Sequence, residues 1–219
     1  MIPMDRPRLI YVFDALCGWC YAFGFEVEKI MNEFGSEVDP LVINGGLVLG
    51  DRVGTFDETY PQIHDSVKQL EQYTGHSFGS AFKEGVLKNT ADYVLDSEIP
   101  SRAMVIFRDH FPERQIEISH ILQKAFYLDG RNISNEEVLA DIAEELGMDR
   151  ASFLLEMNEE SYRLKTLADF QTAQKMGISG FPALAIQIGE KGYLLARGYR
   201  PADEIIGALR ELMVDQSRN

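Results

Sequence analysis

The chain has 219 residues, of which 45% are hydrophobic and 26% charged, enough for one sizeable globular core or for a domain that carries a large insertion. Its net charge of −14 argues against nucleic acid and anionic membranes as partners, because an acidic surface repels phosphate backbones and anionic lipids. No apolar run approaches the ~18 residues that a membrane-spanning helix needs, so we expect neither a membrane protein nor a nucleic-acid binder.

The first expected element is a strand over 9–13. Arg6 and Arg8 precede this apolar stretch and give residues 1–25 a superficial likeness to a secretory signal. Asp14 interrupts the stretch, and cleavage nearby would remove or expose the two cysteines that follow. We therefore predict a cytoplasmic protein. Structural disulfides are rare in that compartment, and CxxC pairs there are usually redox-active or bind a metal.

Cys17 and Cys20 are the only cysteines and form a CxxC motif with Gly18 and Trp19 between them. The motif stands at a corner between the strand and a helical pattern that runs to Phe34. Free amide groups and the positive dipole end of a helix favour an anionic sulfur at its start. We therefore predict that Cys17 is the nucleophile and that Cys20, one turn further on, resolves the mixed disulfide.

Three other interpretations of the pair stay open. A structural disulfide is one, although a bridge that closes so short a loop removes little chain entropy. A zinc half-site is another, but it needs two more ligands, and the four histidines and the absence of a second CxxC offer no such spacing. The third is a pair of inert core thiols.

After the first helix, residues 38–43 predict a second strand, and Pro40 early in it indicates a sheet edge or a strand start. The glycine-rich segment 45–50 lacks the spacing of a phosphate-binding motif, so we expect a turn near the active end of the sheet. From 57 to 157 the pattern predicts helices throughout. Ser134 and Glu137 have the spacing of a capping box, and Asp149 is expected to cap a short helix.

The chain then returns to an α/β pattern. We expect a long helix over 159–176, antiparallel strands over 183–188 and 193–197, and a last helix that opens at Pro201. Without the helical block the order is βαβ followed by αββα. The predicted organisation is thus a discontinuous α/β domain, 1–56 and 158–219, interrupted by a helical insertion, 57–157.

With the CxxC motif, this element order and the turn Gly180-Phe181-Pro182, the chain resembles a thioredoxin-fold protein of the DsbA family over essentially its whole length. It is most similar to the branch in which a tryptophan precedes the second cysteine, which is related to FrnE-like disulfide isomerases and hydroxychromene carboxylate isomerases. The resemblance implies a thioredoxin-like α/β fold with a large all-helical insertion.

The resemblance also implies roles for individual residues. Pro182 would be a cis-proline opposite the CxxC and part of the catalytic set with Cys17 and Cys20. Phe181 would offer its backbone to an extended substrate, and Gly18 and Trp19 would contact substrate too. From the residues alone, a trans proline that starts a strand is the less favoured alternative for Pro182.

Several points stay open at this stage. Gly18 and Trp19 replace the proline and histidine of typical periplasmic members, so the strongly oxidising role does not carry over. Trp19 is either a lid beside the disulfide or an apolar contact for substrate. Asp14 either influences the thiols and accepts hydrogen bonds from the adjoining loop, or is a solvated carboxylate at the end of a strand.

We predict a thiol–disulfide oxidoreductase, a reductase or a disulfide isomerase, without a bound cofactor. Its partners would be a protein or small molecule that carries a disulfide or thiol and a recycling partner, with glutathione or another dithiol as co-substrate. One alternative is a glutathione-dependent isomerase or transferase of small molecules on the same fold. The other is a protein-binding adaptor whose dithiol is idle.

Overall fold

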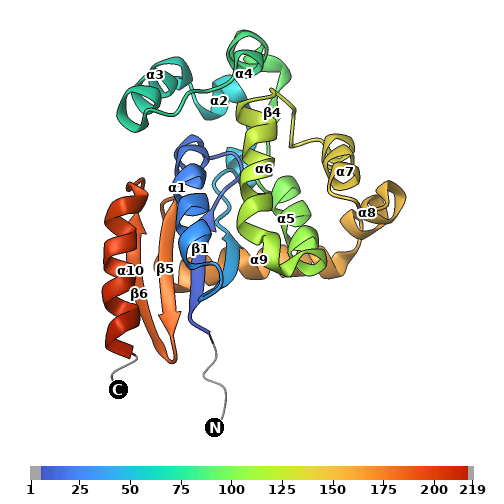
Figure 1. The fold of residues 1–219 in the computed structure, drawn as a ribbon. Coiled ribbons are helices and arrows are strands. Elements are labelled where there is room, and N and C mark those ends of the chain that lie inside the picture. The colour runs from blue at the N-terminus through green and yellow to red at the C-terminus, as the bar shows by residue number, and fades with distance from the viewer. Residues whose placement is uncertain (1–5, 217–219) are drawn as a thin grey trace.

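A computed structural model describes residues 6–216 of the chain, and the side chains of residues 6–213. Its centre is a four-stranded sheet in the order β2-β1-β5-β6, formed by β1 (Arg8–Phe13), β2 (Asp39–Asn44), β5 (Ala183–Ile188) and β6 (Lys191–Arg197) (Figure 1). β1 runs parallel to β2 and antiparallel to β5, which in turn pairs antiparallel with β6. The four predicted strands are confirmed, and β2, which carries Pro40, lies at the edge of the sheet.

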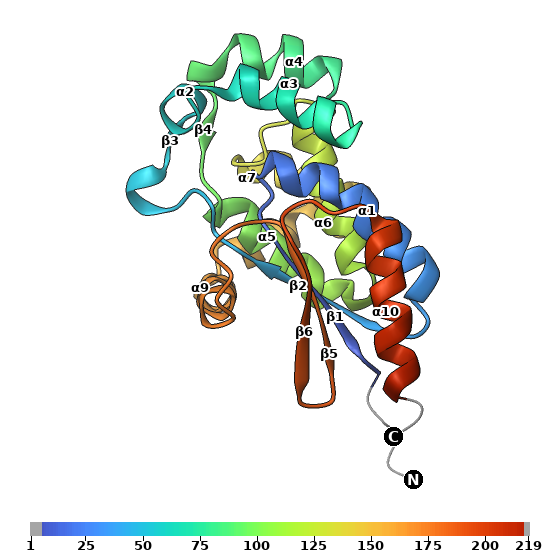
Figure 2. The ribbon, with the colours of Figure 1, turned by 90° about the vertical axis from the view of Figure 1, so that its left-hand side faces the viewer.

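Helices cover both faces of this sheet. α1 (Gly18–Phe34) and α10 (Ala202–Gln216) lie on one face and α9 (Glu160–Lys175) on the other (Figure 2). Successive side chains of a strand point to opposite faces, so Tyr11 belongs to the core with α1 and α10, whereas Val12 packs on the side of α9. This arrangement explains why β1 is an unbroken apolar run: both of its faces are buried.

The segment between β2 and α9 is mostly helical and packs beside the sheet, with α6 along α1 and α5 along α9. Its helices are α2 (Phe56–Thr59), α3 (Ile63–Thr74), α4 (Ser80–Glu84), α5 (Glu98–His110), α6 (Gln115–Tyr127), α7 (Glu136–Glu145) and α8 (Arg150–Met157). Among the described residues, no helix is both long enough and apolar enough to cross a lipid bilayer.

The prediction of helices throughout 57–157 is wrong at one point. β4 (Val94–Leu95) pairs antiparallel with β3 (Gly54–Thr55), which precedes the segment. Strands of two residues are too short to show a periodic pattern, so the sequence gives no signal for them. The domain boundaries stay a prediction, and residues 1–5 and 217–219 of the proposed α/β domain lie outside the described residues.

The predicted helix caps are right at one position and wrong at another. Asp149 caps α8, accepting the Ser152 amide hydrogen at 2.8 Å. At α7, however, Asn135 rather than Ser134 is the cap and accepts from the Glu137 amide at 2.9 Å. The Ser134 hydroxyl accepts from the Asp96 amide instead, because a distant segment supplies that donor.

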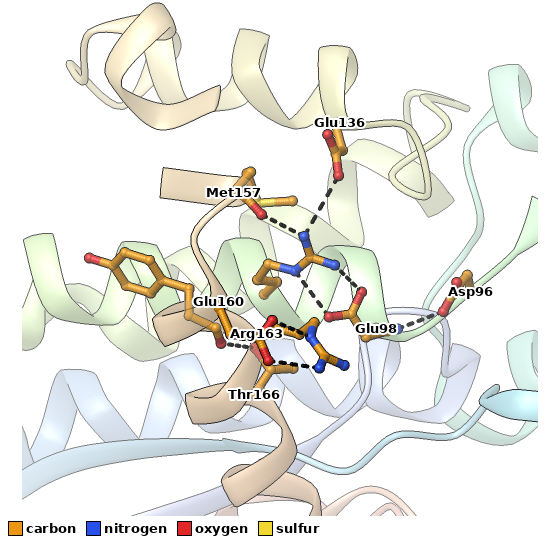
Figure 3. Close-up of polar contacts among 9 residues, drawn as sticks. Asp96, Glu98, Glu136, Met157, Glu160, Arg163 and Thr166 are labelled. Atoms are coloured by element: carbon orange, nitrogen blue, oxygen red, sulfur yellow. Dashed lines mark hydrogen bonds and ion pairs between the residues drawn. The ribbon is translucent and has the colours of Figure 1, made fainter. Parts of the chain in front are cut away.

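Arg102 on α5 connects three helices of the helical segment. The Arg102 guanidinium donates to the carboxylate of Glu98, with Nε at 3.0 Å, and to the carbonyl of Met157, and lies 3.9 Å from Glu136. Figure 3 labels these three partners. These contacts join α5 to the end of α8 and the start of α7. Because the network lies away from the cysteines, we assign it a structural role.

Candidate active site

Cys17 is the N-cap residue of α1. Its backbone is extended, with φ −95° and ψ 110°, and its Sγ accepts the Cys20 amide hydrogen at 3.3 Å. The Cys17 amide itself donates to the carbonyl of Asp14 at 3.1 Å, which fixes the turn between β1 and α1. The first turn of a helix leaves amide groups unpaired, so the sulfur that caps them is held where negative charge is favourable.

The two thiols differ in access. Cys17 is 6% exposed, and Cys20 is completely buried. The sulfurs are not bonded to each other in this structure. Burial raises the pKa of Cys20 well above its usual value, and the neighbouring Cys17 adds to the effect. The neutral thiol is therefore the favoured form of Cys20 in this structure.

The turn before β5 brings Phe181 and Pro182 to the same place. The peptide bond between them is cis. The Phe181 carbonyl oxygen lies 3.7 Å from Cys17 Sγ and accepts from its thiol, across 164 positions of sequence. The Gly198 amide donates to the Pro182 carbonyl at 2.8 Å. Phe181 is thus adjacent to the candidate nucleophile, and Pro182 continues into the sheet.

Gly45 permits this position of Phe181, a role that the sequence analysis missed. A Cβ atom on Gly45 would lie 2.1 Å from Cε1 of the Phe181 ring, far inside van der Waals contact. The ring therefore lies directly over the backbone of the loop after β2. Segment 45–50, expected to be a turn, is a loop with bends at 47 and 48, and its first glycine makes room for the Phe181 ring.

Asp14 is fully buried, so the interpretation as a solvated carboxylate is wrong. Its Oδ1 accepts from the Leu16 amide at 2.9 Å and the Ser97 hydroxyl at 3.0 Å, and its Oδ2 accepts from the Leu47 amide at 2.7 Å. Burial raises the pKa of this carboxyl from its usual 3.8 to about 6, although the hydrogen bonds oppose the rise. Asp14 therefore joins the turn before Cys17 to the loop after β2 and to the start of α5.

A pocket of about 370 Å³ opens beside Cys17, between the start of α1 and the segment of α2 and α3. These helices lie over the end of α1 that carries the motif in both ribbon views (Figures 1 and 2). The wall of the pocket includes Gly18, Trp19 and Phe181. The other residues of the wall are largely apolar: Leu16, Leu47, Phe56, Ile63, Val67, Leu70 and Phe78. Gly180, Tyr60, Ser66 and Tyr127 complete the lining, which contains no charged side chain.

Trp19 forms part of this wall while remaining 36% exposed. Its ring packs edge-to-face on Tyr73, with centroids 5.7 Å apart. The side chain is therefore placed both to cover the motif and to touch anything that enters the pocket, and the two interpretations of Trp19 stay open.

The hydroxyl groups that line the pocket differ in their partners. Tyr127 donates to the Leu16 carbonyl at 2.7 Å, and Ser66 donates to the Gln62 carbonyl at 3.1 Å. The Tyr60 hydroxyl is buried and has no hydrogen-bond partner among residues 6–213. Tyr60 follows α2 immediately, in a stretch with no motif around it, so no pattern in the sequence marks this residue.

The histidines are spread over the molecule. His76 lies 3.1 Å from Glu26, His110 lies 2.9 Å from Glu156, and His120 lies 2.7 Å from Glu28. Within the described part of the chain, no group of three or more His, Cys, Asp or Glu side chains could hold a metal ion.

Comparison with known proteins defines the class. Residues 8–209 match the family model of the DSBA-like thioredoxin domain. The chain belongs to this family, and its α/β sheet with a long helical segment is the thioredoxin-like fold with the helical insertion of DsbA proteins. The CxxC pair, Cys17 and Cys20, lies within the matched region.

Individual relatives are more distant. A candidate protein disulfide isomerase from Nitrosomonas europaea is 26% identical, with a TM-score of 0.83 over 96% of this chain and 99% of that one. The cytosolic disulfide reductase DsbM from Pseudomonas aeruginosa, whose structure is also known with GSH, is 25% identical, with a TM-score of 0.74 over 94% and 99% of the two chains. The ClpXP adapter protein SpxH from Halalkalibacterium halodurans is 21% identical over 95% of this chain and 68% of its own.

Proposed function

We propose that the protein is a thiol–disulfide oxidoreductase that acts as a reductase or disulfide isomerase. The observation that carries the proposal is the asymmetry of the pair: Cys17 caps α1 and faces the pocket, whereas Cys20 is buried with a raised pKa. A nucleophile that faces a pocket and a shielded resolving thiol are what a two-step exchange requires.

In the first step the Cys17 thiolate attacks one sulfur of a substrate disulfide. A bond forms between Cys17 Sγ and that sulfur, and the other substrate sulfur leaves as a thiolate that takes up a proton. In the second step Cys20, after losing its proton, attacks Cys17 Sγ and expels the remaining substrate thiolate. The substrate gains two electrons, and the protein retains a Cys17–Cys20 disulfide. Two molecules of glutathione, or one dithiol, return it to the reduced state and are themselves oxidised to a disulfide.

Phe181 and Pro182 have a supporting part in this proposal. The Phe181 backbone beside Cys17 offers hydrogen-bonding groups to an extended substrate segment, and Gly18 and Trp19 form the adjoining wall. A cytosolic setting is part of the proposal, supported by the likeness to the reductase DsbM. Under it the substrate is a disulfide-bearing protein or small molecule, with no nucleic acid or membrane involved.

Two variants test the scheme. Cys20→Ala removes the resolving thiol, so a mixed disulfide of Cys17 with substrate should accumulate and be visible by mass spectrometry of the intact protein. Cys17→Ala should form no such adduct and should lose exchange activity on a model peptide disulfide by about a thousandfold or more. The proposal fails if Cys17→Ala exchanges disulfides at the wild-type rate.

The pocket favours a second candidate, a glutathione-dependent isomerase or transferase of small apolar molecules. A cavity of about 370 Å³ lies within the range of small-molecule sites. Both cysteines are present, however, and this candidate needs no resolving thiol. Full turnover by Cys20→Ala with glutathione and a small apolar substrate would favour it.

The likeness to SpxH supports a third candidate, an adaptor that binds a protein partner. Under this candidate the CxxC pair would be idle. A stable complex with a partner that forms equally well with wild type and with a Cys17→Ser, Cys20→Ser variant would favour this role over the redox one.

A further inference from the structure

Cys20 shares its buried surroundings with two polar side chains that do not line the pocket, Tyr11 and Gln123. All three residues are completely buried. Tyr11 lies on β1, between two other strands of the sheet. Its ring packs on the rings of Phe13 and Phe23, with centroids 5.4 and 6.0 Å away. The ring is therefore held in one place, and only the hydrogen of its hydroxyl group is free to turn.

The Tyr11 hydroxyl donates to the backbone carbonyl oxygen of Cys20 at 3.2 Å. That carbonyl lies inside α1, where the amide of Gly24, four residues further on, is its regular helical partner. The hydroxyl is thus a second donor to this oxygen. Its hydrogen can turn to another acceptor without leaving the carbonyl unpaired.

Tyr11 keeps its own proton. Burial raises the pKa of Tyr11 well above its usual value, and the charge of Cys20 and a side-chain hydrogen bond with it add to the rise. Tyr11 therefore donates a hydrogen bond and does not act as an acid. An ionised acceptor forms a stronger hydrogen bond than a neutral one, so turning the hydroxyl toward Cys20 Sγ becomes favourable when this thiol ionises.

Gln123 approaches the same hydroxyl from α6. A side-chain hydrogen bond with Gln123 opposes the rise in the pKa of Tyr11 that burial causes. The Gln123 Nε2 also donates to the Asp14 carbonyl at 3.4 Å, whereas its Oε1 is buried without a hydrogen-bond partner within residues 6–213. An unpaired buried oxygen lowers stability, so we assign this amide a role in the site and not in the packing of the core.

We propose that Tyr11 donates the hydrogen bond that stabilises the Cys20 thiolate during the resolving step, and that Gln123 is the positioning residue for the Tyr11 hydroxyl. This inference rests on the proposed function. With Cys17 bound to substrate, Cys20 loses its proton and the Tyr11 hydrogen turns from the Cys20 carbonyl to Sγ. Cys20 Sγ then attacks Cys17 Sγ, and the bond between Cys17 and the substrate sulfur breaks. The expelled substrate thiolate carries away the electron pair and takes up a proton.

Reaction with 4,4′-dithiodipyridine separates the two steps. Attack by Cys17 releases one molecule of 4-thiopyridone, in a phase whose rate is proportional to the reagent concentration. Attack by Cys20 releases the second molecule, in a phase that does not depend on that concentration. Stopped-flow absorbance records both phases, and Cys20→Ala is the reference that should release only the first.

Tyr11→Phe removes the hydroxyl group and keeps the ring. We expect the second phase to slow by about three- to tenfold at neutral pH, because the attacking sulfur keeps part of its negative charge in the transition state. The first phase should stay within about twofold, since Cys17 makes that attack. A second phase as fast as that of the wild type would overturn the proposal.

The pH dependence of the second phase separates this role from a loss of packing. The gap between wild type and Tyr11→Phe should narrow as the pH rises, because Cys20 is then ionised in both and the thiolate without the hydrogen bond is the stronger nucleophile. The other titratable groups near Cys20 are Cys17, Asp14, Tyr60 and Tyr127, which the substitution leaves unchanged. An equal loss of rate at every pH would indicate a packing effect and overturn the proposal.

Two further variants define the network. Tyr21→Phe is the matched control, because Tyr21 is also buried and follows Cys20 in α1, but its hydroxyl donates to the Ser77 carbonyl at 2.9 Å. Both phases should be unchanged in it, and slowing equal to that of Tyr11→Phe would overturn the proposal. Gln123→Met should slow the second phase by a smaller factor, and should have no effect when Tyr11→Phe is already present. Equal slowing in both backgrounds overturns the role of Gln123.

The same traces separate this inference from the function on which it rests. If the wild type shows neither phase, or the first phase without the second, the proposed two-step exchange fails. If both phases are present and Tyr11→Phe does not change the second, this inference alone is overturned. Should Tyr11→Phe fail to fold, Gln123→Met carries the pH comparison, with the same narrowing of the gap expected and a constant gap counting against the proposal.

Discussion

The two sides of the CxxC motif use polar groups in opposite ways. On the side of Asp14, a fully buried carboxylate accepts three hydrogen bonds, from Leu16, Leu47 and Ser97. On the side of the pocket the wall is apolar, and the buried hydroxyl of Tyr60 has no partner in the described part of the chain. The motif therefore lies between a side where a buried carboxylate is hydrogen-bonded and a side whose wall is largely apolar.

The hydrogen-bonded side is suited to positioning the CxxC motif, and the pocket side is suited to contact with a substrate. Satisfied polar groups hold a low-dielectric region in one arrangement, because breaking any of the bonds would leave a buried donor or acceptor unpaired. The wall of the pocket is largely apolar, and its polar contact with the motif is the hydrogen bond from Tyr127 to the Leu16 carbonyl at 2.7 Å. The four predictions that follow test this division.

The largest expected effect is the difference in reactivity between the two thiols. With limiting iodoacetamide at neutral pH, Cys17 should be alkylated about 100-fold faster than Cys20 or more, because Cys20 is fully buried and its pKa is raised. Peptide mapping by mass spectrometry measures the ratio. Comparable labelling of both residues in the folded protein would show that the two thiols do not differ in access.

Asp14→Asn tests the closed side through the pH dependence of stability. Because burial raises the pKa of Asp14 from 3.8 to about 6, the folded state binds the proton more tightly than the unfolded state. Its contribution is therefore fully present below about pH 4 and is lost as the pH rises through 6. At 1.36 kcal/mol for each pKa unit, a shift of about two units corresponds to a loss on the order of 2–3 kcal/mol.

Urea denaturation of wild type and Asp14→Asn between pH 4 and 7 makes the comparison. The variant should lack this component, so the wild-type advantage should shrink as the pH rises. Asparagine also offers one acceptor oxygen in place of two, so one buried amide, such as that of Leu47, loses its partner at a cost of about 1–3 kcal/mol. Parallel stability profiles for the two proteins would contradict the assignment to Asp14.

Gly45→Ala tests the contact that places Phe181. The added methyl group would meet the Phe181 ring at 2.1 Å, so either the ring or the loop has to move. We expect a loss of stability of about 1–3 kcal/mol, as for other overpacked sites, and slower exchange at Cys17. Gly207→Ala is the matched control, because a Cβ there meets nothing within 4 Å, and alanine favours the helix. Equal stability of the two variants would show that the Phe181 ring is not fixed by the loop.

The smallest effect is expected for Trp19→Ala, which opens the outer wall of the pocket. If Trp19 contacts substrate, exchange with an apolar disulfide should slow by a few-fold, in keeping with the loss of one partly exposed aromatic contact. If it is only a lid, exchange should instead become faster, because access to Cys17 increases. Stopped-flow rates with a neutral aromatic disulfide distinguish these outcomes, and Tyr73→Ala shows whether the edge-to-face partner matters.

Much of the fold follows from local patterns. The apolar run of β1, the helical spacing of α1 and the antiparallel β5 and β6 are confirmed, because apolar runs, turn residues and a period of 3.6 residues depend only on near neighbours. Two predictions from local patterns are wrong. Ser134 does not cap a helix, because its hydroxyl accepts from the Asp96 amide, and the two-residue strands β3 and β4 were not predicted. In both cases the deciding partner is far away in the sequence.

For the candidate site, the sequence by itself determined the chemistry at the start of α1. Two cysteines three positions apart at a strand-to-helix corner place one sulfur on the cap and the other inside the first turn, whatever the remainder of the chain does. Only the tertiary structure decided what surrounds them. Asp14 is buried by Leu47 and Ser97, 33 and 83 positions away, and the Phe181 carbonyl reaches Cys17 across 164 positions. The burial of a side chain depends on contacts from segments that are distant in the sequence and meet only in the folded chain. The pKa of a buried carboxyl or thiol and the polarity of a pocket depend on that burial, so no local pattern predicts them.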